Sequence, residues 1–255
     1  IAGQILGTSG YEEAAGAGLL AGINASLYID NKPWFTLRRD QAYLGVMIDD
    51  LVTKGTKEPY RLLSSRSEYR LITRSDNADE RLIKMGYDLG LNSKDRYDKY
   101  LKRMDELKVA EHALDTIYVG LNEKTPKYLE SVGETKPIGS TSYKDLLKRP
   151  KVTYEGLQQC EPKLPVLSSD LGVKIETNVK YKGYIDLEEK DVEKMQAMES
   201  LILPQDLDYS KVEGISLEAR EKLNKIKPKT IGEASRITNV HPADIDRLLF
   251  LIRKK

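Results

Sequence analysis

The sequence predicts a mainly α-helical chain, and three observations support this prediction. Apolar residues recur at three-, four- or seven-residue steps over two long segments, residues 93–119 and 169–203, and this is the periodicity of amphipathic helices. Serine or threonine followed three residues later by glutamate precedes several shorter segments, and this capping pattern marks helix starts. Prolines stand where helices are expected to end or begin, at Pro204 and Pro242.

The chain opens with a glycine-rich turn followed by a helix. Ser9 and Glu12 form a capping pattern, so we expect a helix to start near Gly10. The turn before it leaves peptide N–H groups at a helix N-terminus, where the helix dipole favours carbonyl or phosphate oxygens of a ligand. A ligand site and a turn that merely packs tightly are both open interpretations. The predicted packing face of the helix consists of small residues: Ala14, Ala15, Gly18, Ala21 and Gly22.

A second helix is predicted over residues 38–51, where apolar residues share one face. Asp49 and Asp50 lie near its end, and two adjacent acids raise the possibility of a metal site. They point to different sides of a helix, however, and no third ligand of a suitable type is close in sequence. We therefore expect these carboxylates to cap a helix or to form salt bridges.

Residues 53–86 carry the densest group of charges. Arg66, Arg70 and Arg74 are spaced by four, and this spacing keeps them on one face of either a helix or a strand. A planar guanidinium donates two parallel hydrogen bonds to a phosphate. The spacing is therefore suited to an RNA backbone, and Tyr60 or Tyr69 could stack on an unpaired base.

Ser65 and Glu68 form a further capping pattern, which favours a helix through this stretch. In the alternative interpretation, the arginines belong to a solvated surface and only form ion pairs with neighbouring acids. Those acids are Glu68, Asp76, Asp79 and Glu80.

The two longest helices are expected at residues 93–119 and 169–203, with a bend in the second at Gly183. Prolines divide residues 120–165 into short connecting helices, such as residues 143–148. Basic and aromatic residues alternate within the second long helix, which on its own is weak support for RNA binding. These residues are Lys180, Tyr181, Lys182 and Tyr184.

Residues 204–255 are predicted to form a compact module of three helices, at residues 216–227, 230–238 and 242–253. Thr230 and Glu233 supply a capping pattern for the second helix, and Pro242 suits the first position of the third. A DNA-binding helix-turn-helix is disfavoured, because the third helix has few side chains that read bases.

Composition limits the possible functions. The 255 residues contain 41 Lys and Arg against 40 Asp and Glu, a formal charge of +1, so any RNA surface must be local.

Cys160 is the sole cysteine, which excludes an internal disulfide and a multi-cysteine zinc site. We expect it to be a packed residue. With only His112 and His241, a two-histidine metal site or a catalytic triad has little support. No apolar run reaches the roughly 18 residues of a membrane helix.

Several ordered motifs resemble the GidA/MnmG family. At the start they are AGQI, GTSGYEEAA and AGINA; further on they are DDLVTKG, EPYR, SR-x-EYRL, R-x-DNAD-x-RL and VKYKGYIDLEE. The resemblance is strongest over residues 1–86 and 174–255. The chain departs from the family at Leu6, where the family usually has Asn, and it lacks the glycine-rich FAD fingerprint and the redox-active cysteines that lie upstream in the family.

The resemblance implies a division of the chain into three parts. Residues 1–30 are expected to be the last turn and helix of an α/β FAD-binding domain, residues 31–203 a helical tRNA-binding and connecting region, and residues 204–255 a small helical module that docks a partner. The implied cofactor-binding residues are Gln4, Gly7, Thr8, Ser9 and Gly10. The implied RNA-binding residues are Arg66, Arg70, Arg74 and Arg81.

The resemblance also implies the activity of an intact protein. With FAD, NADH, a folate one-carbon donor and a GTPase partner of the MnmE type, a cytoplasmic homodimer would install a 5-(carboxymethyl)aminomethyl group on the wobble uridine of tRNA. The chain begins with Ile, and we expect it to be a portion of such a protein that is inactive alone and carries no catalytic residue. No membrane association is expected.

Two alternatives belong to other classes. One is a stand-alone helical module that binds RNA or protein without flavin chemistry, but it would have no use for the opening residues Gly3, Gln4, Thr8 and Gly10. The other is a folate-dependent uridine methyltransferase flavoprotein, against which the C-terminal helical region argues.

Overall fold

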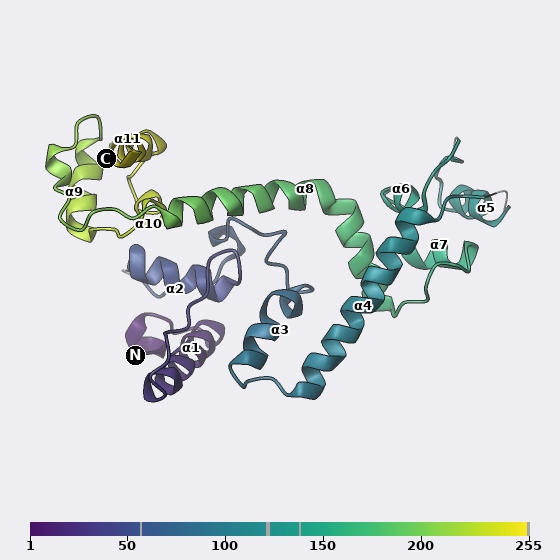
Figure 1. Ribbon diagram of the computed structural model, residues 1–255, viewed down its shortest axis with the longest axis horizontal. Helices are drawn as coiled ribbons and strands as arrows, with labels where there is room; N and C mark the ends of the chain where they lie inside the picture. The colour runs from purple at the N-terminus through teal and green to yellow at the C-terminus, as the bar shows by residue number, and fades with distance from the viewer. Residues whose placement is uncertain (57, 121–122, 138, 254–255) are drawn as a thin grey trace. The chain divides into compact units, whose positions relative to one another are not determined.

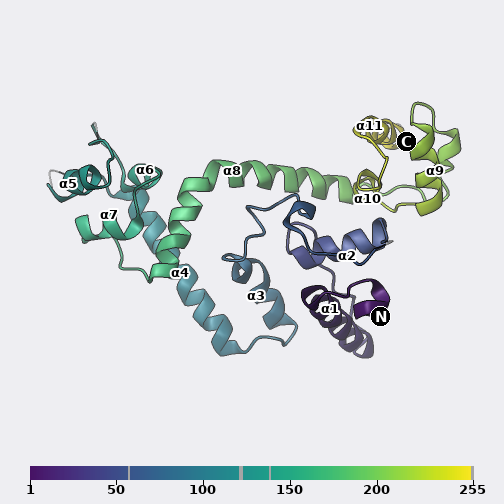
Figure 2. The same cartoon turned by 180° about the vertical axis from the view of Figure 1, so that it is seen from behind.

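The computed structural model describes residues 1–56, 58–120, 123–137 and 139–253, drawn from two opposite sides in Figures 1 and 2. Within these residues the chain is helical and contains no strand beyond two isolated bridges, so the mainly α fold is confirmed. The α-helices are α1 (Tyr11–Ile29), α2 (Tyr43–Thr53), α3 (Ala78–Asp88), α4 (Lys94–Thr116), α5 (Lys124–Ser131), α6 (Tyr143–Leu147), α7 (Tyr154–Cys160), α8 (Ser169–Ser200), α9 (Leu217–Ile226), α10 (Ile231–Ser235) and α11 (Pro242–Arg253). The 3-10 helices are η1 (Gly3–Leu6), η2 (Ser64–Arg66) and η3 (Tyr209–Lys211).

The chain divides into two compact units. Unit 1 consists of Ile1–Arg74 and Glu188–Lys255, and unit 2 consists of Ser75–Leu187. The division falls within α8, so the first part of this helix is described with unit 2 and its last part with unit 1.

Unit 2 has its core where α4, α5, α6, α7 and the first turns of α8 meet. Ser142 and Thr153 cap α6 and α7, since their hydroxyl oxygens accept from the peptide N–H groups of Asp145 and Gly156. A Cβ at Gly156 would lie 2.2 Å from Cζ of Tyr128, so glycine is needed for this close approach. The fully buried side chains of this core include Leu114, Leu129, Leu146, Leu147, Leu157 and Ile175.

Helix α4 confirms the first long helix predicted from periodicity, and its N-cap is Ser93, which accepts from Arg96 N. Leu107 and Leu114 are buried as expected, whereas Leu101 and Tyr118 are exposed. Tyr87 of α3 stacks on Tyr97 of α4 with ring centroids 4.7 Å apart, which holds these two helices together.

The start of α8 secures α3 within unit 2, because Lys174 forms an ion pair with Glu80 and donates to Asp76 O. Helix α8 also confirms the second predicted long helix. Of its predicted buried side, Leu171, Ile175, Val179 and Val192 are buried. Tyr184 and Ile202 were predicted on the same side of the helix but are exposed.

In unit 1, α1 packs against α2, but two predictions about α1 are wrong. The N-cap is Gly10, with no side-chain cap, in place of Ser9. The buried face is formed by Glu13, Ala17, Leu20 and Ile23, not by the small residues, several of which are exposed. The larger apolar side chains bury more surface against α2 and the following loop, and this outweighs the close approach that glycines would allow.

Helix α2 begins at Tyr43, later than the predicted residue 38. The residues before it approach the helix closely, since a Cβ at Gly45 would lie 2.2 Å from Arg38 O. The chain therefore folds back on α2 before the helix starts, and periodicity alone does not reveal this turn.

Residues 204–255 are called the C-terminal module here, and its described residues, 204–253, form an apolar core together with Leu203. The predicted capping pattern is present: Thr230 Oγ1 accepts from Glu233 N at 3.0 Å, and Glu233 Oε2 accepts from Lys229 N at 2.6 Å. Pro242 is the first residue of α11, as predicted. The buried side chains are Leu203, Tyr209, Val212, Ile215, Ala219, Leu223, Ile231, Ala234, Ile237, Val240, Ile245 and Leu248.

The helix predicted after Ser65 is wrong. Only the short η2 forms there, and the chain then passes through extended and turn conformations until α3 begins at Ala78. Glu68 binds the guanidinium of Arg39, with Oε1 2.7 Å from Nη2. Glu68 therefore does not cap a helix, because its carboxylate binds a residue that is distant in the sequence.

Candidate nucleic-acid interface and cofactor turn

The predicted cofactor turn is a 3-10 turn closed by glycine. Gly7 has φ 80°, in the left-handed region that disfavours residues with a Cβ. Its N–H donates to Gln4 O, and both the N–H and the hydroxyl of Thr8 donate to Gly3 O. Thr8 is fully buried and its side chain stabilises the turn, whereas Gln4 and Ser9 are exposed.

Two hydrogen bonds join this turn and the first turn of α1 to the beginning of the arginine segment, by which we mean residues 60–74. Tyr60 N donates to Gly7 O at 2.8 Å, and Leu62 N donates to Oε1 of Glu13 at 2.8 Å. The Leu62 N–H holds the pKa of the buried Glu13 carboxyl below its ordinary value. A Cβ at Gly10 would lie 1.9 Å from the Glu13 carboxylate, so a larger residue there would displace the Glu13 side chain from this position.

Arg39 is the buried centre of a charged cluster beside this junction. Its side chain is 4% exposed, and its guanidinium binds Asp49, Asp50 and Glu68 at 2.7 to 2.8 Å. Burial opposes the charge of Arg39, but the hydrogen bonds that its guanidinium donates to Glu68 and Asp50 keep its pKa raised. The expected salt-bridge role of the two aspartates is therefore confirmed.

Asp50 accepts hydrogen bonds from two further residues, which fix its charge. Lys54 Nζ and Tyr60 Oη donate to it at 2.8 Å, in addition to Arg39. Burial alone would raise the pKa of Asp50, but these hydrogen bonds lower it. The Tyr60 hydroxyl is buried and bound to a carboxylate, so its pKa is raised. Among the described residues, no group of histidines, cysteines and acids is arranged to hold a metal ion.

The arginine segment presents its side chains unequally. The Arg66 guanidinium lies over the Tyr60 ring, 4.5 Å from its centroid, and the Arg66 carbonyl accepts from Arg39 Nη2 at 3.3 Å. Arg66 and Arg70 are exposed. Arg74 is partly buried and donates to Leu71 O at 2.6 Å. Because the segment is not a helix, helical spacing does not place the three arginines on one face.

Arg81 belongs to unit 2, where its Nε donates to Asn77 Oδ1 at 3.2 Å. Three of the four neighbouring acids are paired with other cations. Glu68 binds Arg39, Asp79 lies 3.6 Å from Arg96, and Glu80 binds Lys174. For Arg66 and Arg70 these pairs weaken the interpretation as a self-neutralised surface, whereas Arg74, Arg81 and Asp76 have further partners of their own.

The alternating basic and aromatic residues of α8 serve the fold in part. Lys180 Nζ donates to the carbonyl oxygens of Val152 and Pro150, and Lys182 pairs with Asp186. Cys160 is buried, and burial raises the pKa of its thiol, in agreement with a packed residue.

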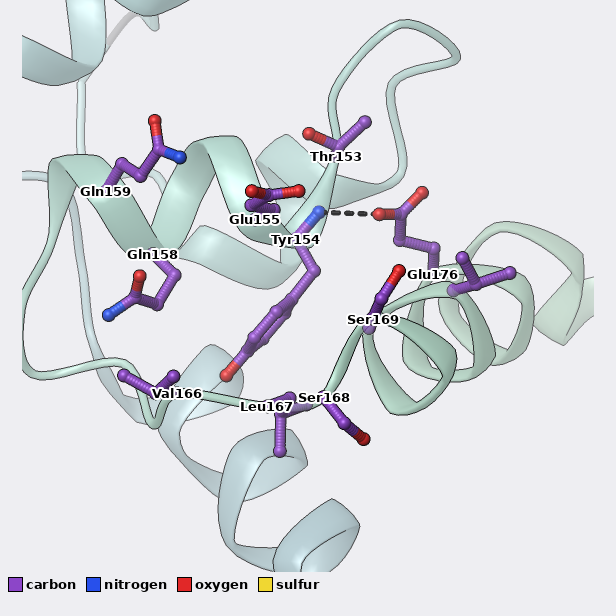
Figure 3. Close-up of a pocket in the computed structure, with 12 residues that line it drawn as sticks. Thr153, Tyr154, Glu155, Gln158, Gln159, Val166, Leu167, Ser168, Ser169 and Glu176 are labelled. Carbon is purple, nitrogen blue, oxygen red and sulfur yellow. Dashed lines mark hydrogen bonds between the residues drawn. The ribbon is translucent and has the colours of Figure 1, made fainter.

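Figure 3 shows a pocket of about 410 Å³ in unit 2, between α7 and the first turns of α8. Tyr154 N donates to Glu176 Oε1 at 2.8 Å across it. Its twelve lining residues include Glu155 and Glu176 but no lysine or arginine. A lining with two carboxylates and no lysine or arginine disfavours phosphate, so this pocket is poorly suited to an RNA backbone.

No sequence pattern marks Arg39 or Glu13 as a site residue. Arg39 follows another arginine without periodicity, and its partners come from α2 and from the arginine segment. Only their assembly in space shows the role of these residues. No described helix is both long and apolar enough to cross a membrane.

Comparison with known families gives consistent matches along the chain. The model described as "Glucose inhibited division protein A" matches residues 1–33. The models for the "tRNA modifying enzyme MnmG/GidA C-terminal helical domain" and "C-terminal helical bundle" match residues 94–189 and 191–255.

Individual relatives agree. The tRNA uridine 5-carboxymethylaminomethyl modification enzyme MnmG of Clostridium kluyveri is 46% identical over 254 residues, covering 100% of this chain and 40% of the relative. That of Lactobacillus delbrueckii subsp. bulgaricus is 48% identical over 247 residues, covering 96% and 39%. The crystal structure of Aquifex aeolicus GidA, form II, matches with a TM-score of 0.77 and 41% identity, covering 98% of this chain and 39% of that chain.

These matches define the class of protein. The chain contains the helical C-terminal domains that are found in a family of tRNA-modifying enzymes. The chain belongs to the MnmG/GidA family. It spans about two fifths of the length of the curated relatives that it matches.

Proposed function

We propose that the chain is the part of a flavoprotein that holds tRNA and docks a GTPase, in an enzyme that installs a 5-(carboxymethyl)aminomethyl group on the wobble uridine. The names of the relatives, which specify tRNA uridine modification at position 5, support the reaction. The observation that carries the chain's own role is the hydrogen bond from Tyr60 N to Gly7 O. It joins the cofactor turn to the arginine segment, so a flavin and a target nucleotide would be bound at neighbouring places.

The cofactor turn fits FAD in part. Gly7 and Thr8 use their N–H donors inside the turn, so a cofactor oxygen would be bound at the opening of α1, near Ser9 and Gly10, where the helix dipole favours it. Gln4 is exposed beside this opening and can donate through its amide. FAD would supply redox chemistry when bound, and these residues would hold it.

An apolar pocket of about 680 Å³ runs along α1 and supports the assignment of residues 1–30 to a larger flavin domain. Trp34 and Tyr28 border it and are each more than 70% exposed. Large apolar side chains grouped in this way mark a surface that another domain covers. In our proposal, that domain is the remainder of the FAD-binding fold.

The RNA contacts are assigned to Arg66, Arg70 and Arg74 in unit 1, and to Arg81 in unit 2. Exposed guanidinium groups at Arg66 and Arg70 support direct phosphate contact. Residues 31–203 would form the tRNA-binding and connecting region, and the C-terminal module would dock the GTPase. The use of NADH and a folate donor, the homodimer and the cytoplasmic location rest on the family resemblance.

The test is the double variant Arg66→Ala/Arg70→Ala in the full-length protein, with Lys99→Ala/Lys108→Ala on the exposed side of α4 as a control of equal charge change. We expect at least tenfold weaker tRNA binding. The dependence of log affinity on log salt should fall by about 2, or about 1 for each lost phosphate contact. The control should change neither quantity to this extent. Unchanged affinity and salt slope in the arginine variant would overturn the RNA assignment.

A further inference from the structure

Arg236 attaches the C-terminal module to the rest of unit 1. It follows α10 directly, and its guanidinium contacts Asp49 of α2, with Nε 2.8 Å from Oδ2 and Nη2 donating to Oδ1 at 3.1 Å. It also forms an ion pair with Glu199 near the end of α8. The Arg236 side chain is only 13% exposed. A single guanidinium therefore joins three helices that are far apart in the sequence.

The carboxylate of Asp49 is shared between two arginines. Its Oδ2 atom lies 2.8 Å from Arg236 Nε and also 2.8 Å from Arg39 Nη1. One oxygen of Asp49 contacts both guanidinium groups. A displacement of Arg236 therefore changes the position of the Asp49 carboxylate and the balance of charges around Arg39.

Arg39 carries this connection to the arginine segment. Its Nη2 donates to the carbonyl of Arg66 and to Glu68. The Arg66 guanidinium is held separately by the Tyr60 ring, and the Tyr60 hydroxyl is bound to Asp50 of the same cluster. Both the backbone and the side chain of Arg66 thus depend on the charged cluster around Arg39.

The charge balance shows what the loss of Arg236 would do. Three cations, Arg39, Arg236 and Lys54, face the carboxylates of Asp49, Asp50, Glu68 and Glu199. Without Arg236, Asp49 and Glu199 lose their common partner inside a partly buried cluster. Uncompensated carboxylates in such a place are unfavourable, so the cluster must rearrange around Arg39.

We propose that Arg236 is a positioning residue for RNA binding. It does not touch the nucleic acid; through Asp49 and Arg39 it holds Arg66 in the conformation that binds phosphate. The inference rests on the proposed function of the arginine segment, and it adds a coupling between the C-terminal module and RNA binding. A partner that displaces Arg236 on binding the module changes RNA affinity, and RNA changes the partner's affinity by the same factor.

The experiment is a double-mutant cycle on tRNA affinity and its salt slope in the full-length protein. Arg236→Gln is compared with Arg236→Lys and with Arg247→Gln, which removes the same charge from α11, where Arg247 contacts Glu213 and Phe250 of the module. We expect Arg236→Gln to weaken tRNA binding about threefold to tenfold. Arg236→Lys should restore most of the affinity, and Arg247→Gln should have little effect.

The decisive measurement is Arg236→Gln in the Arg66→Ala/Arg70→Ala background, where it should weaken binding no further. An equal weakening in both backgrounds, or no weakening in either, overturns the positioning role. Failure of the proposed function is recognised separately, because Arg66→Ala/Arg70→Ala would then bind tRNA normally. Helicity and the thermal midpoint are measured for each variant. If Arg236→Gln does not fold, Arg236→Lys replaces it in the cycle. Its loss of tRNA affinity should be smaller, and this loss must also vanish in the Arg66→Ala/Arg70→Ala background.

Discussion

The C-terminal module and the arginine segment carry the same kind of local sequence signal, but only the module folds as that signal predicts. In the module, Thr230 Oγ1 accepts from Glu233 N, and the Glu233 carboxylate accepts from Lys229 N, the residue before the N-cap. In the arginine segment, Ser65 and Glu68 have the same spacing, yet Glu68 binds Arg39 and no helix follows. A capping pattern predicts a helix where its glutamate has no stronger partner elsewhere in the fold.

The two regions also differ in what holds them. The module has its own apolar core of buried leucine, isoleucine and valine side chains, so its helices are stabilised by contacts that follow the sequence periodicity. The arginine segment is held largely by polar contacts to α1, α2 and Arg39. Its conformation is therefore decided by residues outside the segment.

Arg39→Ala should have the largest effect, because it leaves Asp49, Asp50 and Glu68 without their common cation. We expect the free energy of unfolding, measured by urea denaturation, to fall by about 3 to 5 kcal/mol. Arg96→Ala is the control, since Arg96 and Asp79 form a pair in which both side chains are 63% exposed; its effect should stay below about 1 kcal/mol. Equal, small losses of unfolding free energy from both variants would show that the arginine segment is held by its own local contacts.

Leu223→Ala tests the apolar core of the module. Leu223 is fully buried in α9, and truncation of such a leucine removes about 2 to 5 kcal/mol of stability. Leu217 begins the same helix but is 71% exposed, so Leu217→Ala should change stability by less than about 0.5 kcal/mol. If the two variants unfold alike, the module does not depend on its own core, and the contrast with the arginine segment disappears.

The same contrast explains which parts of the structure were predictable. The long helices α4 and α8, and the caps at Thr230 and Pro242, follow from periodicity and local chemistry. The packing face of α1 was mispredicted because small residues suggested close approach, while Ala17, Leu20 and Ile23 are the apolar residues that α1 buries. Both faces of α1 contain apolar residues, so the sequence alone does not show which face is buried.

For the candidate site, the sequence indicated the chemistry of the residues but not their arrangement. Arginine spacing pointed to Arg66 and Arg70, and these side chains are exposed. The buried Arg39 and the link from Gly7 to Tyr60 connect residues far apart in the chain, and a local pattern contains no information about such pairs. The conformation of the arginine segment is thus a tertiary property of unit 1.

The smallest expected effect separates the two capping patterns directly. Thr230→Ala removes an acceptor for Glu233 N and a donor to Glu199, and it should lower the free energy of unfolding by about 0.5 to 2 kcal/mol. Thr230→Ser keeps the hydroxyl and should recover most of this loss. Ser65→Ala alters the same sequence pattern where no α-helix is capped, so we expect a change within about 0.5 kcal/mol. A loss at Ser65 as large as that at Thr230 would mean that Ser65 stabilises the segment locally, and the distinction between the two regions would not hold.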